Sequence, residues 1–152
     1  MTSLRFAAGT VLAVLFSVSA AQAQVTVTDA WVRATVPQQR ASGAFLRLDS
    51  VADATLVQAS SALAAVVEIH QMSMQGDVMK MQQVPGIALP AGTTVVLEPG
   101  GYHIMLMELK RTLKAGDTVP LTLVVETADK QRREVQVQAT VRALNSAHGA
   151  GK

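Results

Sequence analysis

The sequence predicts an all-β domain, either a sandwich or a closed barrel, from three observations. Short stretches rich in β-forming residues follow one another along the chain. Turn-forming glycine, proline and aspartate residues punctuate them at short intervals. No long stretch shows apolar residues at the 3.6-residue spacing of an amphipathic helix. Short strands separated by turns are typical of antiparallel β folds, so this is the fold class we expect.

The expected elements follow from local composition. The loops are a polar segment at 37–43 and a second segment at 85–92 that carries two prolines, while residues 61–65 could form one helical turn. Residues 75–77 are expected to turn a hairpin between Met74 and Val78, and residues 99–101 to make a sharp turn. The predicted strands are 25–28 leading into 31–34, 44–49, 56–59, 66–71, 93–98, 102–109, 118–126 and 133–141.

The first 23 residues have the pattern of an export signal. Arg5 precedes an apolar stretch at 6–18, and Ala21-Gln22-Ala23 is a small-residue cleavage site. We therefore expect residues 1–23 to be removed and the mature chain to begin at Gln24. A retained membrane anchor is the alternative. The β-domain is expected at 24–142, and the small, polar residues 143–152 are expected to be a disordered tail.

Composition narrows the function. The chain has 13 basic and 11 acidic residues and few aromatic ones, which does not favour nucleic-acid binding. It contains no cysteine, which excludes a thiolate nucleophile, a cysteine-based zinc site and a blue-copper electron-transfer centre. It also lacks a phosphate-binding loop and a nucleophile elbow, so we do not expect an enzyme.

Methionine and histidine gather in one window of the chain. Two-residue spacing on a strand puts side chains on one face, while residues such as Ile69 and Ile104 point the other way, toward a core. Thioether sulfur is a soft donor that selects Cu(I), and imidazole is compatible with it. Core packing is the simpler interpretation for any single methionine, but not for the set, since each histidine would then need a buried polar partner. The window contains His70, Met72, Met74, Met79, Met81, His103, Met105 and Met107.

The spacing within this window resembles that of the periplasmic copper chaperones of the PCu(A)C type. Ten residues separate His70 from Met81, and twenty-one separate Met81 from His103, which opens a His-x-Met motif completed by Met105. The resemblance extends over essentially the whole mature chain. It implies a cupredoxin-like Greek-key β-sandwich or barrel that binds one Cu(I) through His70, Met81, His103 and Met105.

The resemblance also implies a place and a partner. It implies a monomer in the periplasm that delivers copper to the dinuclear centre of cytochrome c oxidase subunit II, alongside Sco-type thiol proteins. A protein that only sequesters copper, for tolerance, is the alternative. Some members of the family carry a His- and Met-rich C-terminal extension, whereas this tail has only His148, which makes a second copper site there doubtful.

The remaining candidates have simpler interpretations. Met72, Met74, Met79 and Met107 are expected to line the site as apolar cover, or to act as transient ligands. Glu68 and Asp77 flank the ligands and could supply a hydrogen bond, but solvated carboxylates are the simpler interpretation. Trp31 is expected to anchor the core. The basic group Lys110, Arg111 and Lys114 is expected to be solvated surface.

Overall fold

The computed structural model describes residues 24–145, and these form an all-β domain. The predicted signal peptide at 1–23 and residues 146–152 of the predicted tail lie outside the described residues. No helix in the described part of the chain could cross a membrane. The strands are β1 (Val25–Arg33), β2 (Ala41–Ser50), β3 (Ala54–Ser60), β4 (Ala64–Gln75), β5 (Val78–Gln83), β6 (Ile87–Leu89), β7 (Thr94–Leu97), β8 (Tyr102–Leu109), β9 (Thr118–Thr127) and β10 (Arg132–Arg142).

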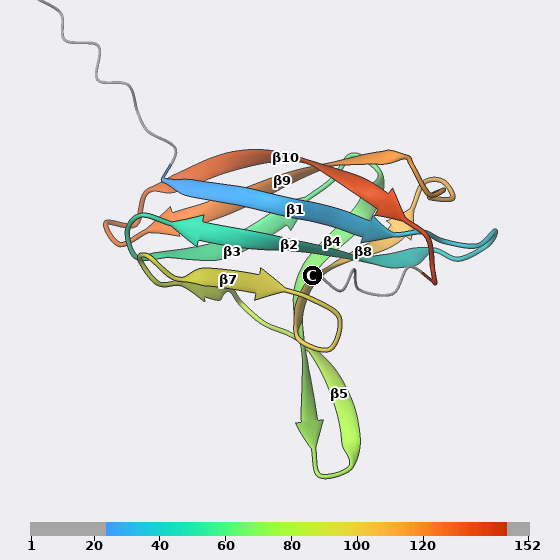
Figure 1. The fold of residues 1–152 in the computed structure, drawn as a ribbon, viewed down its shortest axis with the longest axis horizontal. Helices are drawn as coiled ribbons and strands as arrows, with labels where there is room; N and C mark the ends of the chain where they lie inside the picture. Colours follow the sequence, from blue (N-terminus) through green and yellow to red (C-terminus); the bar gives the residue numbers. More distant parts are fainter. Residues whose placement is uncertain (1–23, 146–152) are drawn as a thin grey trace, which may run out of the picture.

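The strands form one continuous, strongly curled sheet. Their order is β5-β4-β8-β2-β1-β10-β9-β3-β6, and β7 pairs with the second half of β2. β1 and β10 run parallel, and the other pairs are antiparallel. β3 and β4 also lie close together although they do not pair, so the sheet folds over on itself (Figure 1). The result is a β-sandwich, as the sequence predicts.

Apolar side chains from most strands fill the space between the layers. Strict alternation produces this core: in β9 every second residue is buried, and in β8 Ile104 and Leu106 are fully buried. Ile69 of β4 is buried as well, as the sequence predicts. Each Å² of apolar surface removed from water contributes about 25 cal/mol to the free energy of unfolding, so this buried face is the main source of stability. The opposite face of β4 and β8, which carries His70, His103 and Met105, is therefore not part of this core.

The second half of β4 leaves the body of the domain. β4 pairs with β8 only as far as Gln71, and beyond that residue β5 is its partner. In Figure 1 the β4–β5 hairpin projects as an arm from the main body. β5 is an edge strand whose six residues are all exposed. The arm therefore gains little from core packing.

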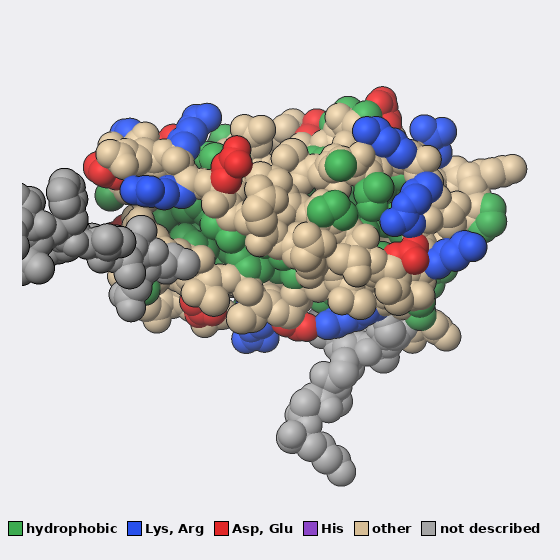
Figure 2. Space-filling view, turned by 90° about the horizontal axis from the view of Figure 1, so that it is seen from above, with side chains coloured by type: hydrophobic (Ala, Val, Ile, Leu, Met, Phe, Trp, Pro, Cys, Tyr) green, Lys and Arg blue, Asp and Glu red, His purple; other side chains and the backbone are tan. Residues whose placement is uncertain are grey.

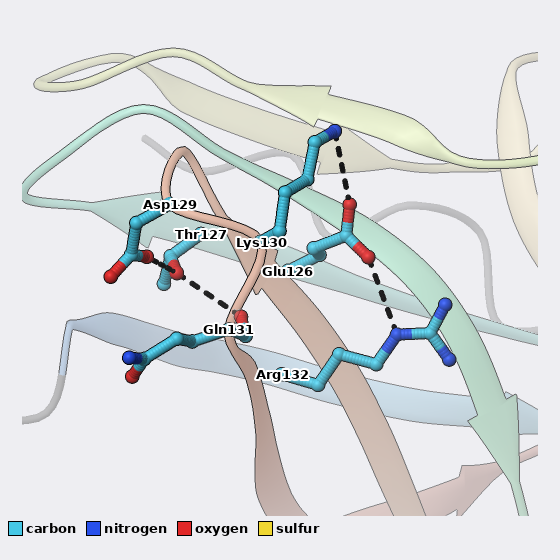
Figure 3. Close-up of polar contacts among 6 residues, drawn as sticks. All are labelled: Glu126, Thr127, Asp129, Lys130, Gln131 and Arg132. Carbon is cyan, nitrogen blue, oxygen red and sulfur yellow. Dashed lines mark hydrogen bonds and ion pairs between the residues drawn. The ribbon is translucent and has the colours of Figure 1, made fainter.

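Polar contacts hold the turn between β9 and β10 (Figure 3). The hydroxyl of Thr127 donates to Asp129 and also lies 3.1 Å from the carbonyl oxygen of Gln131. Glu126 accepts from Lys130 at 3.4 Å and from Arg132 at 3.3 Å. The hydrogen bond from Arg132, followed by that from Lys130, lowers the pKa of Glu126. These contacts shape the turn and lie outside the His/Met window.

Figure 2 shows the molecule from above, over the strands β1, β9 and β10. Hydrophobic side chains gather in the middle of this face, and basic side chains stand mainly toward its ends with acidic ones among them. A nucleic-acid interface needs a clustered basic surface. The face drawn in Figure 2 has no continuous surface of that kind.

Three local predictions differ from the structure. The segment expected as a loop at 85–92 contains the short strand β6, which pairs with β3 through Ile87 and Leu89. Both side chains are buried, so tertiary pairing overrides the flanking prolines. Residues 61–65 form no helical turn: a turn at residues 62–63 leads directly into β4. The strand expected at 44–49 begins earlier, at Ala41.

Candidate metal centre

Strand pairing brings the two histidines together. β8 lies between β4 and β2, and its register sets His103 directly opposite His70. Directly opposed residues share one face of the sheet. The two imidazole rings meet edge to face with centroids 5.8 Å apart. Met105, two residues further along β8, lies on this face opposite Glu68 on one side and Gly43 on the other.

His70 is held by one nitrogen and leaves the other unused. Its Nε2 lies 2.7 Å from Oε2 of Glu68, and the side chain is 11% exposed. The carboxylate can only accept, so Nε2 donates, and in the neutral imidazole Nδ1 then carries the lone pair. Nδ1 is the one buried side-chain polar atom without a hydrogen-bond partner among residues 24–145. A buried atom of this kind requires an explanation, and a metal ion would provide one.

Glu68 takes the less favoured of its two predicted roles, that of a hydrogen-bond partner. We expected a solvated carboxylate, but the side chain is 30% exposed and its carboxylate pairs with His70. Residues 68 and 70 lie on the same face of β4, which brings the carboxylate to the imidazole ring. A carboxylate on the far nitrogen of a metal-binding histidine fixes the tautomer and orients the ring. The two-residue spacing of Glu68 and His70 on a predicted strand was the sequence feature that could have indicated this pair.

His103 is buried and is kept neutral. It is 6% exposed, and its Nδ1 lies 3.3 Å from the carbonyl oxygen of Gly101. Burial lowers the pKa of His103 below its ordinary value of 6.5. The bond to Gly101 opposes this effect, and the nearby charges of His70 and Arg33 reinforce it. Neutral imidazole is the form that binds metals. A proton on Nδ1 leaves Nε2 available as a ligand.

An open hollow of about 270 Å³ lies beside these groups. Four of its lining residues carry soft or nitrogen donors: Met72, Met81, His103 and Met105. His70 is not among the lining residues, but its ring contacts that of His103. The structure thus brings three of the four predicted ligands to one hollow and places the fourth next to it. Met72, opposite Met81 in the hairpin, joins them.

An aromatic group supports the buried histidine. The Phe45 ring lies 6.3 Å from the His103 ring and 4.5 Å from Trp31, centroid to centroid. The expectation for Trp31 was wrong: it is half-buried on the outer face, beneath the guanidinium of Arg142, and is not part of the core. Gly43 makes room for the ring, since a Cβ there would lie 2.9 Å from Cζ of Phe45.

The donor set fits a soft monovalent cation. Among residues 24–145 no group of three or more His, Cys, Asp and Glu side chains could hold a metal ion. The site instead offers imidazole nitrogen and thioether sulfur, which favour Cu(I). A nearby carboxylate and a buried unpartnered nitrogen add to the fit. Ligands could come from Met72, Met81, His103 and Met105, which line the hollow, and from His70 beside His103.

The other candidates lie outside this centre. Met107 is half-buried further along β8 and does not line the hollow. Lys110, Arg111 and Lys114 are exposed, as predicted, and Arg111 pairs with Asp117 at 2.8 Å. Asp77 is exposed at the tip of the β4–β5 hairpin. His148 lies outside the described residues.

This chain matches a known protein family and one curated relative. Residues 25–139 match the model of the LpqE-like family, which is described as a lipoprotein family. Lxx21020 of Leifsonia xyli subsp. xyli (strain CTCB07), which its name describes as a lipoprotein, is 36% identical over 100 residues. That alignment covers 65% of this chain and 60% of Lxx21020. The chain therefore spans about 60% of the length of this curated relative.

Solved structures agree on the fold. Apo-DR1885 from Deinococcus radiodurans is 33% identical, with a TM-score of 0.60, over 97% of this chain and 99% of that one. The Cu(I) form of DR1885 is 37% identical, with a TM-score of 0.60, over 82% and 83% of the two chains. A copper-bound PCuAC domain from PmoF2 is 23% identical, with a TM-score of 0.65, over 80% and 94%. The chain belongs to the LpqE-like family and has the cupredoxin-like fold of PCuAC domains.

Proposed function

We propose that this protein is a Cu(I) chaperone that carries one copper ion on His70, Met81, His103 and Met105. The observation that carries the proposal is the buried, unpartnered Nδ1 of His70 beside the His103 ring. In each histidine one ring nitrogen lies next to an acceptor: Nε2 of His70 beside Glu68, and Nδ1 of His103 beside the Gly101 carbonyl oxygen. The remaining ring nitrogen is then available as a ligand. The likeness to a copper-bound PCuAC domain and to Cu(I)-DR1885 supports the same ion.

The chemistry favours a carrier over a catalyst. Imidazole and thioether are neutral donors, so the charge of Cu(I) stays on the complex. The carboxylate of Glu68, one hydrogen bond away, offsets part of that charge. Met81 is 50% exposed on the arm, so one ligand remains accessible to an acceptor. Thiolates are stronger ligands for Cu(I) than thioethers, which would allow transfer to a cysteine-bearing partner.

Export and delivery complete the proposal. The lipoprotein names of the family and of Lxx21020 support an exported protein, and the sequence pattern before Gln24 supports the same route. We place the protein in the periplasm. By its resemblance to PCu(A)C chaperones, it would deliver copper to cytochrome c oxidase subunit II together with Sco-type thiol proteins.

The test is a Cu(I) titration of residues 24–152 against a colorimetric chelator. The matched sample is the double variant His70→Ala/His103→Ala. We expect binding of one ion that the double variant loses. Equal binding by both samples would mean that the two histidines do not hold the ion, and no binding by either would mean that the methionines serve packing instead. In cells, deletion should lower oxidase activity; a loss of copper tolerance alone would indicate sequestration without delivery.

A further inference from the structure

The projecting arm carries methionines that the central site does not use. In the β4–β5 hairpin Met72 pairs with Met81, and Met74 pairs with Met79. Residues two apart on a strand share a face, so all four thioethers lie on one side of the arm. The same face continues to His70, which is opposite Gln83. The methionine face is thus continuous with the candidate metal centre.

These methionines are poorly explained by packing. Met74 is 60% exposed and Met79 is 45% exposed, and β5 is an edge strand. Exposed strand positions favour β-branched residues such as threonine over methionine. The other face of the arm carries mainly polar side chains, including Ser73 and Lys80. The methionine face differs from the polar face of the arm in carrying four thioether sulfur atoms.

The spacing suits stepwise transfer of a cation. Opposed residues in a hairpin have Cβ atoms about 5 Å apart, so both thioethers of a pair can reach one ion. Successive pairs are separated by two residues, or about 7 Å along the strand. Met72 and Met81 already line the hollow with His103. The Met74–Met79 pair therefore lies one step outside the centre, toward the tip.

We propose that Met74 and Met79 form a second, weaker site for a soft monovalent cation, which captures Cu(I) and passes it inward. The inference rests on the proposed copper function and adds the route of loading to it. The ion moves by ligand exchange: thioethers of the inner pair Met72–Met81 bind as those of the outer pair leave. No electron or proton is transferred. Two thioethers without imidazole bind more weakly, so the ion does not remain at the tip.

The first experiment uses Ag(I), a soft cation without redox chemistry, on full-length mature protein labelled at the methionine methyl groups. The double variant His70→Ala/His103→Ala disables the central site. We expect the Met74 and Met79 methyl resonances to shift and saturate as Ag(I) is added, while that of Met107 stays in place. Unmoved Met74 and Met79 resonances would overturn the proposal.

The second experiment keeps the central site intact and measures the rate of Cu(I) uptake from a chelator complex. Met74→Leu/Met79→Leu should slow uptake several-fold and leave the final affinity unchanged, because leucine keeps the apolar surface but removes sulfur. Met107→Leu is the matched control and should load at the normal rate. Uptake by the double leucine variant at the normal rate would overturn the proposal, because the two sulfur atoms would then not be needed for loading. The final affinity separately tests the central site.

Discussion

Replacing Glu68 by alanine should weaken Cu(I) binding about tenfold while the fold is kept. The 2.7 Å contact with Glu68 holds the His70 proton on Nε2, and this leaves Nδ1 free. Losing such an outer partner generally reduces metal affinity by about 10- to 100-fold. The Glu68 side chain is 30% exposed, so water can replace part of the bond. The lower end, about 1.4 kcal/mol, is therefore expected.

Competition with a colorimetric chelator at pH 7 measures this loss. Glu68→Gln should fall between wild type and alanine, because its amide oxygen is a neutral acceptor of the same size. Glu134→Gln, on the exposed side of β10, is the remote control. Nitrogen NMR of the His70 ring reports the tautomer directly. Wild-type affinity in Glu68→Ala, or a proton found on Nδ1 of native His70, would refute the reasoning.

Three further predictions concern the centre and its support. Met81→Leu nearly conserves volume, so the melting temperature should hold while chelator competition shows weaker Cu(I) binding; unchanged affinity would remove Met81 from the ligand set. Gly43→Ala puts a Cβ 2.9 Å from Cζ of buried Phe45 and should lower the free energy of unfolding by about 1–3 kcal/mol in urea titrations, whereas no loss would mean that the ring moves freely. Burial lowers the pKa of His103, so between its folded pKa and 6.5 the unfolded chain binds more protons than the folded one. The free energy of unfolding of the metal-free protein should therefore decrease as the pH is lowered through that window. The free energy of unfolding of His103→Gln should decrease less. A pH profile identical in both proteins would contradict the assignment.

Much of the fold follows from local pattern. Period-2 alternation places Ile104 and Leu106 in the core and His103 and Met105 on the opposite face, as observed. Turn residues mark the hairpin between β4 and β5. The segment 85–92 was misread because flanking prolines outweighed the short apolar run of β6. Its pairing with β3 joins segments about thirty residues apart in the sequence, which no local window shows.

The sequence by itself determined the donor types, their separation from the core and the absence of thiolate chemistry. Tertiary structure decided which donors meet. Insertion of β8 between β4 and β2 sets His70 opposite His103, Gly43 opposite Met105 and Phe45 near the His103 ring. It also decided that Trp31 stacks on the outer face and that the arm leaves the body at Gln71. Alternation reports which way a side chain points, whereas strand order depends on non-local pairing across the whole sheet.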